Sequence, residues 1–251
     1  MSPTDALAAR LLEASRITVL TGAGVSAASG VPTFRGENGL WRNVRAETLA
    51  TAEAFENDPK LVWEWYDWRR SVIRAAQPNA AHHALAAWTR ARSGVTVITQ
   101  NVDGLHGIAG NSPEKTVELH GTDRKVNCLG CGKEFDPDPI YRRLEEDIAP
   151  PPCGACGGLL KPATISFGQP MPQAEMKRAQ EWSEAAEVFI VVGSSLVVQP
   201  AASFPVIAKQ NGALLVIVNR ESTPLDNLAD YNFRGAIGEF FTQLNPLLAD
   251  G

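Results

Sequence analysis

Four short apolar runs constrain the fold of this chain more than any other feature. They are rich in β-branched residues, each ends at a polar or glycine-bearing turn, and they span 17–21, 95–99, 188–192 and 214–218. Such nearly continuous hydrophobicity is typical of strands that are covered on both faces. Helical patterns at 173–186, 201–210 and 238–248 lie between or after these runs. The sequence therefore predicts an α/β fold with a doubly wound, Rossmann-like parallel sheet.

Two segments interrupt this alternation of strands and helices. Residues 42–93 hold an aromatic-rich helical stretch at 61–70 and a second helix near 80–91, whereas residues 126–160 hold the cysteines and several prolines. We interpret both as insertions that together form a small lobe, with a ligand cleft between the lobes, beyond the carboxyl ends of the strands. The predicted division is a Rossmann-like domain of 1–41, 94–125 and 161–251, a helical insertion of 42–93 and a zinc-binding insertion of 126–160.

The composition narrows the class of protein. No apolar run approaches the ~20 residues of a membrane span, and the first residues predict an amphipathic helix, capped by Thr4 or Asp5, where a secretory signal would stand. The net charge of −5 argues against nonspecific nucleic-acid binding. We therefore expect a cytoplasmic protein that binds neither membranes nor nucleic acid. The oligomeric state is left open, with a monomer as the simplest expectation.

The chain's four cysteines form two tight pairs, Cys128 with Cys131 and Cys153 with Cys156. In a cytoplasmic chain this spacing favours tetrahedral thiolate ligation of one zinc ion. Four thiolates fill the coordination shell, so the zinc is predicted to be structural and not catalytic. Two disulfides, or four unrelated core cysteines, are the alternatives.

A glycine-rich loop, Gly22-Ala-Gly-Val-Ser26, follows the first predicted strand directly and is expected to open a helix. Backbone N–H groups in such a loop can face a pyrophosphate. Gly30 comes later than the third glycine of the common dinucleotide fingerprint. The segment 31–36 then places an aromatic ring and a guanidinium just past the loop. The alternative is a surface turn with one buried Phe.

Six motifs in order resemble the signature of the sirtuin family, over about residues 15 to 240. They are 22–36, Thr99-Gln-Asn-Val-Asp103, Leu119-His-Gly121, the two cysteine pairs, Gly193-Ser-Ser195 and Val218-Asn-Arg-Glu221. The resemblance implies an NAD-consuming protein deacylase that transfers an acyl group from lysine to ADP-ribose and releases nicotinamide. It also implies NAD as co-substrate and one structural zinc.

The resemblance further implies which residues bind NAD. They lie in the glycine loop, in the segment after it and at three later strand ends: Gly22, Ala23, Gly24, Ser26, Pro32, Thr33, Phe34, Arg35, Trp41, Gln100, Asn101, Val102, Asp103, Gly193, Ser194, Ser195, Asn219, Arg220, Glu221 and Ile237. Phe34 would shield the reacting sugar from water. The Asp103 carboxylate would stabilise positive charge that develops there.

His120 is the implied general base. With an ordinary pKa near ~6.5, its imidazole can accept a proton at neutral pH. In the implied mechanism the acyl oxygen attacks the ribose as nicotinamide departs, and His120 takes a proton from the ribose hydroxyls. Outside the resemblance, a hydrogen-bonded structural histidine is the alternative. His82, His83 and His106 are assigned no catalytic role.

The substrate residues are Tyr66, Arg69, Ala50, Phe167 and Gly168. Tyr66 and Arg69 lie three apart, on one helix face, and can bind a carboxylate together. This pair resembles the sirtuin subgroup that removes succinyl, malonyl or glutaryl groups, and the small Ala50 would leave room for them. The alternative is an amphipathic helix with Arg69 and Arg70 in solvent. Ser166 and Gln169 depart from the apolar and acidic residues that are usual in the family.

The predicted function is therefore an NAD-dependent protein-lysine deacylase, acting on acyl-lysine side chains and preferring succinyl or malonyl over acetyl groups. An enzyme of the same family that acts mainly as a deacetylase is the first alternative. A nicotinamide dehydrogenase is a second. A non-catalytic zinc-ribbon binding module is the alternative from another class, and the acidic net charge disfavours it as a nucleic-acid binder.

Overall fold

A six-stranded, wholly parallel sheet forms the centre of the computed structural model, which describes residues 2–35, 39–42, 45–145 and 150–249. Its order is β3-β2-β1-β7-β8-β9. The bounds are β1 Ile17–Thr21, β2 Val95–Thr99, β3 Thr116–Glu118, β7 Val188–Val192, β8 Leu214–Val218 and β9 Tyr231–Phe233. The four predicted strands are thus confirmed, and this order is that of a doubly wound dinucleotide-binding fold.

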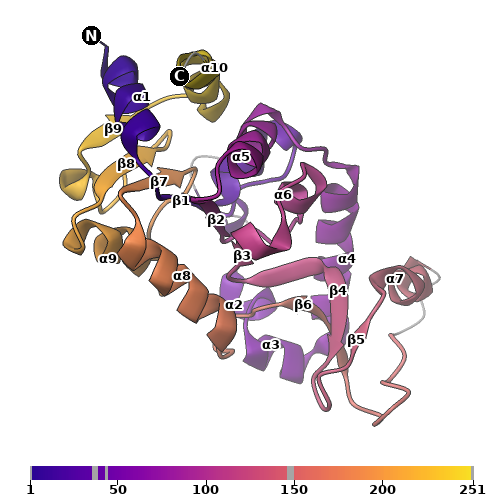
Figure 1. The fold of residues 1–251 in the computed structure, drawn as a ribbon. Helices are drawn as coiled ribbons and strands as arrows, with labels where there is room; N and C mark the ends of the chain where they lie inside the picture. The colour runs from indigo at the N-terminus through magenta and orange to yellow at the C-terminus, as the bar shows by residue number, and fades with distance from the viewer. Residues whose placement is uncertain (1, 36–38, 43–44, 146–149, 250–251) are drawn as a thin grey trace.

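Helices cover both faces of this sheet, as Figure 1 shows. On one face α1 (Pro3–Glu13), α5 (Ala80–Ala91) and α10 (Ile237–Ala249) share a core with the strands. On the other, α8 (Gln173–Ala185) and α9 (Phe204–Gln210) share a second core. Strands such as β1 and β7 are buried along their whole length because each residue faces one of these two cores.

The first helix begins earlier than predicted. Ser2 is its N-cap, and Pro3 occupies the first helical position, where a proline loses no hydrogen bond. Ser2 Oγ accepts from the Asp5 backbone N–H at 3.1 Å, and the Asp5 carboxylate accepts from the Ser2 N–H at 2.8 Å. The expected cap at Thr4 or Asp5 is therefore wrong, since Asp5 closes a capping box from inside the helix.

A second, three-stranded antiparallel sheet lies beside the large one, in the order β5-β4-β6. Its strands are β4 Gly121–Cys128, β5 Glu134–Phe135 and β6 Leu160–Thr164, and the helices near it are α2 Ala46–Leu49, α3 Ala52–Asn57, α4 Pro59–Ala75 and α7 Pro137–Glu145. A third core joins these helices and strands, with Phe55, Trp63 and Tyr66 against Tyr141 and Leu160.

This shared core supports the proposed small lobe of 42–93 and 126–160. Helix α5 is different, because it packs on the large sheet, so we propose that the helical part of the lobe ends near residue 75.

The remaining short elements are α6 Leu105–Ile108 and 3₁₀ segments at Ala23–Ser29, Leu40–Arg42, Pro113–Lys115, Ala201–Ser203 and Asp226–Leu228.

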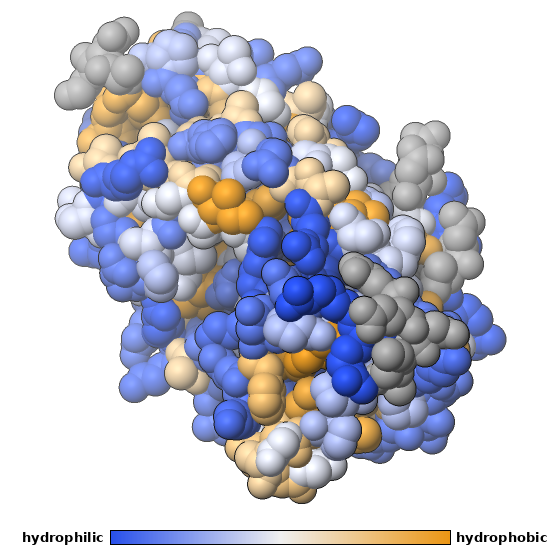
Figure 2. All heavy atoms as spheres, turned by 90° about the vertical axis from the view of Figure 1, so that its right-hand side faces the viewer, coloured by the Kyte–Doolittle hydropathy of each residue, from blue (hydrophilic) through white to orange (hydrophobic). Residues whose placement is uncertain are grey.

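The side of the molecule that carries α4 and α7 is mainly hydrophilic, with apolar residues in small separate patches (Figure 2). Within the described ranges, no helix is both long and apolar enough to cross a membrane.

Candidate functional site

The site lies at the carboxyl ends of β1 and β7, which are neighbours where the strand order reverses. Here two backbone loops touch. Gly193 has a φ of +65°, and a Cβ on it would lie 2.5 Å from the Val25 nitrogen. A Cβ on Gly24 would likewise meet Gly193 at 2.8 Å. Glycine is required at positions 24 and 193 because no side chain fits between the two loops. The backbones of the two loops therefore border the space for a ligand.

The loop after β1 continues as a 3₁₀ segment, Ala23–Ser29, in place of the expected α-helix. Gly30 ends it in the left-handed conformation, with a φ of +83°. Asn79 holds the segment from outside, since its amide donates to the Val25 carbonyl at 2.8 Å and to Ser29 Oγ at 2.9 Å. The backbone N–H groups of this loop, more than the dipole of a long helix, could thus face a phosphate.

A cavity of about 1000 Å³ opens between this loop, the strand ends and the small sheet. It brings together most of the predicted site residues: Gly22, Ala23, Gly24, Pro32, Thr33, Phe34, Arg35, Ala50, Tyr66, Arg69, Gln100, Asn101, Val102, His120, Phe167, Gly168, Gly193, Ser194, Ser195, Asn219, Arg220, Glu221 and Ile237. Ser26 and Asp103 are buried and do not line it, although Asp103 lines a small adjoining cavity together with Asn101 and Arg69. The side chain of Trp41 lies outside the described part of the chain.

His120 lies on the wall of this cavity, between β3 and β4. Its Nδ1 is 2.9 Å from the Gln100 carbonyl oxygen, which can only accept a hydrogen bond. Nδ1 therefore carries the proton and Nε2 keeps a lone pair. Burial lowers the pKa of His120, although the hydrogen bond to Gln100 opposes this effect. A neutral imidazole with one free nitrogen is the state that a general base needs.

Ser26 and Asp103 form a buried polar cluster under the loop. Ser26 Oγ donates to Asp103 Oδ2 at 2.7 Å and accepts from the Asn101 amide at 3.1 Å. Burial raises the pKa of Asp103, against the hydrogen bonds from Leu105 and Ser26 that lower it. With Ser26 committed to these partners, its role in cofactor binding is indirect in this arrangement.

Two further histidines, His82 and His106, lie next to this cluster, and their place there was not predicted. His106 Nε2 is 2.9 Å from Thr21 Oγ, and the rings of His82 and His106 are 4.9 Å apart. Burial lowers the pKa of His82 to about 4 and that of His106 to about 3, so both are neutral. The one local signal was the Asn79-Ala-Ala-His82 spacing, which forms a capping box for α5.

The other end of the cavity is formed by Tyr66 and Arg69 of α4. Arg69 is only 9% exposed and Arg70 only 6%, so the alternative with both in solvent is wrong. The Arg69 guanidinium carbon lies 4.8 Å from the centroids of both the Trp65 and Tyr66 rings. Its Nη2 donates to Asp123 Oδ1 at 2.9 Å. Asp123 was not predicted from the sequence, and it supplies the anion that a buried arginine requires.

The Tyr66 hydroxyl is buried among polar and cationic groups. It lies 3.4 Å from Ser166 Oγ, and the ammonium of Lys161 lies 5.7 Å from the centre of its ring. Burial alone would raise the pKa of Tyr66, but the charges of Lys161 and Arg69 outweigh it and leave that pKa below its ordinary value. The phenol is consequently a strong hydrogen-bond donor toward an anion in the cavity.

Ala50 and Phe167 pair through their backbones at the mouth of the cavity. The Phe167 N–H donates to Ala50 O at 2.8 Å, and the Ala52 N–H donates to Phe167 O at 2.9 Å. The Phe167 side chain is 44% exposed. Gln169, one of the two departures from the family pattern, turns back and accepts from the Ser166 N–H at 2.8 Å. This departure shapes the loop locally, and the cavity stays open beside it.

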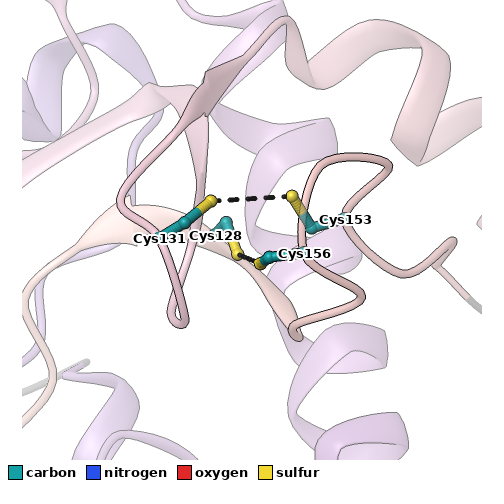
Figure 3. A group of neighbouring side chains, drawn as sticks. All are labelled: Cys128, Cys131, Cys153 and Cys156. Atoms are coloured by element: carbon teal, nitrogen blue, oxygen red, sulfur yellow. Dashed lines mark hydrogen bonds between the residues drawn. The ribbon is translucent and has the colours of Figure 1, made fainter.

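The four cysteines converge from two loops, as Figure 3 shows. Their sulfurs all lie within 4.8 Å of one another, with 3.4 Å between Cys128 and Cys156 and 3.8 Å between Cys131 and Cys153. Sulfurs that surround one zinc ion at ~2.3 Å are about 3.8 Å apart. The donors therefore fit a tetrahedral zinc site. Because Cys128 and Cys153 are part of the third core, the metal would hold the small sheet to α4 and α7.

Comparison with known proteins agrees with the geometry. A protein-family model described as "Sir2 family" matches residues 22–200 of this chain. An "NAD-dependent protein deacylase" of Aquifex aeolicus is 50% identical over 223 residues, or 89% of this chain and 91% of that protein.

Among solved structures, a Sir2 homologue in complex with NAD is 42% identical, with a TM-score of 0.86 over 98% of this chain and 94% of that one. A complex described as "Sir2-p53 peptide-NAD+" is 32% identical, with a TM-score of 0.89 over 100% of both chains. These matches confirm the resemblance to sirtuins. The chain belongs to the Sir2 family.

Proposed function

We propose that this protein, an NAD-dependent protein deacylase of the Sir2 family, prefers acidic acyl groups such as succinyl or malonyl. The observation that carries the proposal is one cavity that holds three features: the glycine loop and Gly193, His120 with a free Nε2, and the Tyr66–Arg69 pair. Together they offer a place for a dinucleotide, a base and an acyl group.

The chain's own residues then have distinct tasks. The loop backbone and Ser194 would position the dinucleotide, and Asn101 and Asp103 would hold its nicotinamide half. Bound NAD would supply the sugar carbon that the acyl oxygen attacks as the bond to the leaving nicotinamide breaks. His120 Nε2 would take one proton from a ribose hydroxyl, and the Gln100 carbonyl would hold the resulting imidazolium by the bond at Nδ1, 2.9 Å long.

The preference for acidic acyl groups rests on charge at the Tyr66 end of the cavity. Arg69 and Lys161 are both buried there. Lys161 Nζ donates to the backbone carbonyls of Pro162 and Thr164, and the Tyr66 phenol is a further side-chain partner. Burial lowers the pKa of Lys161, and the neighbouring Tyr66 opposes this effect. Basic side chains around a phenol donor favour an anionic ligand.

The test compares NAD-dependent release of nicotinamide on matched succinyl-lysine and acetyl-lysine peptides. Turnover should require both NAD and the acyl peptide, with kcat/KM higher for succinyl. Arg69→Met should abolish this preference, a change of about tenfold or more, because it removes a charge-assisted hydrogen bond. Arg74→Met is the matched control, since Arg74 lies on the same helix but half exposed, paired with Asp138, and it should leave the preference intact.

If acetyl-lysine is consumed as fast as succinyl-lysine by the unmodified protein, the acidic preference is refuted and the first alternative, a deacetylase, holds. The bond between Arg69 and Asp123 is the observation that favours this alternative, since it neutralises part of the cationic charge. If NAD is reduced instead of cleaved, the dehydrogenase alternative holds. If no acyl peptide is consumed, the remaining alternative is a non-catalytic zinc-ribbon binding module.

A further inference from the structure

Asp123 lies behind Arg69, which lines the acyl end of the cavity. Its carboxylate is almost fully buried, with 1% of the side chain exposed. One oxygen, Oδ1, accepts from Arg69 Nη2 at 2.9 Å. The other, Oδ2, has no hydrogen-bond partner and lies 4.0 Å from Arg70 Nη1. The carboxylate thus occupies one edge of the guanidinium that we assign to the acyl group.

The backbone of Asp123 fixes that carboxylate in place. Its N–H donates to the Val102 carbonyl at 2.8 Å, and its carbonyl accepts from Arg70 Nη1 at 2.9 Å. Val102 belongs to the segment that we assign to the nicotinamide half of NAD. The main chain of Asp123 is therefore held from both sides, and its side chain is buried against Arg69.

Arg69 would then be shared between the Asp123 carboxylate and the acyl carboxylate of the substrate. Its Nε is buried without a hydrogen-bond partner and its Nη2 is used by Asp123, so an acyl carboxylate is left with the rest of the guanidinium and with the Tyr66 hydroxyl. The two carboxylates would be close neighbours at a guanidinium that is itself buried. Two like charges on one guanidinium repel each other, and this repulsion should weaken binding of the acyl carboxylate by about tenfold or more.

We propose that Asp123 is a specificity-determining residue of this enzyme: a built-in counter-ion of Arg69 that limits the preference for acidic over neutral acyl groups. The inference rests on the proposed function and concerns the size of the acidic preference. It makes Asp123 a positioning residue, which acts on the acyl group through Arg69.

The experiment measures kcat/KM for succinyl-lysine and acetyl-lysine peptides in the unmodified protein and in Asp123→Asn. The asparagine oxygen can still accept from Arg69, but the opposing charge is gone. The succinyl-to-acetyl ratio should rise by about tenfold, with acetyl turnover little changed. Asp138→Asn is the control, because Asp138 pairs with Arg70 and Arg74 and does not contact Arg69; its ratio should equal that of the unmodified protein.

The direction of the change separates the possible roles. An unchanged or lower ratio in Asp123→Asn overturns the inference, since a residue that only supports the fold would reduce both activities together. That outcome leaves the proposed function standing as long as Arg69→Met lowers the ratio. An Arg69→Met protein with an unchanged ratio, in contrast, removes the proposed acidic preference itself.

A second measurement covers the case in which Asp123→Asn does not fold. In the unmodified protein, succinyl-lysine should be consumed no more than about tenfold faster than its neutral isostere, succinamyl-lysine, because Asp123 opposes the acid. A preference clearly above tenfold would mean that the acyl carboxylate meets an unopposed guanidinium, and the inference would be wrong.

Discussion

Gly193 offers a quantitative test of the contact between the two loops. It has a φ of +65°, and a Cβ placed on it would lie 2.5 Å from the Val25 nitrogen and 2.7 Å from the Gly24 carbonyl carbon. The substitution is Gly193→Ala. Because both neighbours are backbone atoms on the ligand side of β1, neither can move away without shifting the glycine loop.

Two separate costs make up the expected loss of stability. A left-handed backbone conformation costs a residue with a Cβ about 1–2 kcal/mol, and forcing one extra carbon into a packed site costs about 1–3 kcal/mol more. Gly193→Ala should therefore lower the free energy of unfolding by about 2–5 kcal/mol. For a chain of this size, each kcal/mol corresponds to about 2–4 °C in Tm.

Gly212→Ala is the matched control, because Gly212 has a φ of +90° but no atom within 4 Å of the added Cβ. It should show only the backbone cost, about 1–2 kcal/mol, with NAD affinity unchanged. Denaturant unfolding and NAD titration by calorimetry give both quantities. If Gly193→Ala loses no more stability than Gly212→Ala and still binds NAD normally, the two loops are not in the close contact described.

Three further outcomes are expected. His120→Asn should lower kcat/KM by about 10²–10⁴. Since burial lowers the pKa of His120, the rate of the unmodified protein should hold as the pH falls to about 6.5 and decline only below it. A pH profile whose half-maximal rate lies above about pH 6.5 contradicts this role. The folded protein keeps His82 and His106 neutral, with pKa values of about 4 and about 3, whereas the unfolded chain binds protons near pH 6.5. Unfolding free energy should therefore fall by about 2 kcal/mol per histidine between pH 7 and pH 5, and urea unfolding of His106→Asn should show a smaller dependence on pH. Chelation of zinc, or Cys156→Ser, should abolish activity together with the near-ultraviolet signal of the small-lobe aromatics; activity that survives complete removal of zinc argues against a structural metal.

The elements with strong local signals were predictable from the sequence. The runs at 17–21 and 188–192 are strands because their residues are apolar on both faces, and that pattern needs no knowledge of the partners. The cysteine pairs were predictable for a similar reason, since their spacing is short and chemically specific. His120 was singled out by the resemblance to the sirtuin motifs, and its catalytic role stays a prediction.

What could not be predicted depends on contacts between distant parts of the chain. Asp123 meets Arg69 across 54 positions, through the way β4 runs past α4, and nothing near Asp123 in the sequence indicates it. The burial of Arg70 was missed for the same reason. The loop after β1 became a 3₁₀ segment because Asn79 and Gly193 confine it from two sides, which local propensity does not encode.

The most direct test of the central claim is a mass-spectrometric assay of one mixed panel of succinyl-, malonyl-, glutaryl- and acetyl-lysine peptides with NAD. The account predicts free lysine peptide, nicotinamide and acyl-ADP-ribose in equal amounts, with the acidic acyl peptides consumed ahead of the acetyl peptide. Loss of acyl groups without NAD cleavage, or cleavage of NAD without acyl-ADP-ribose, would contradict it.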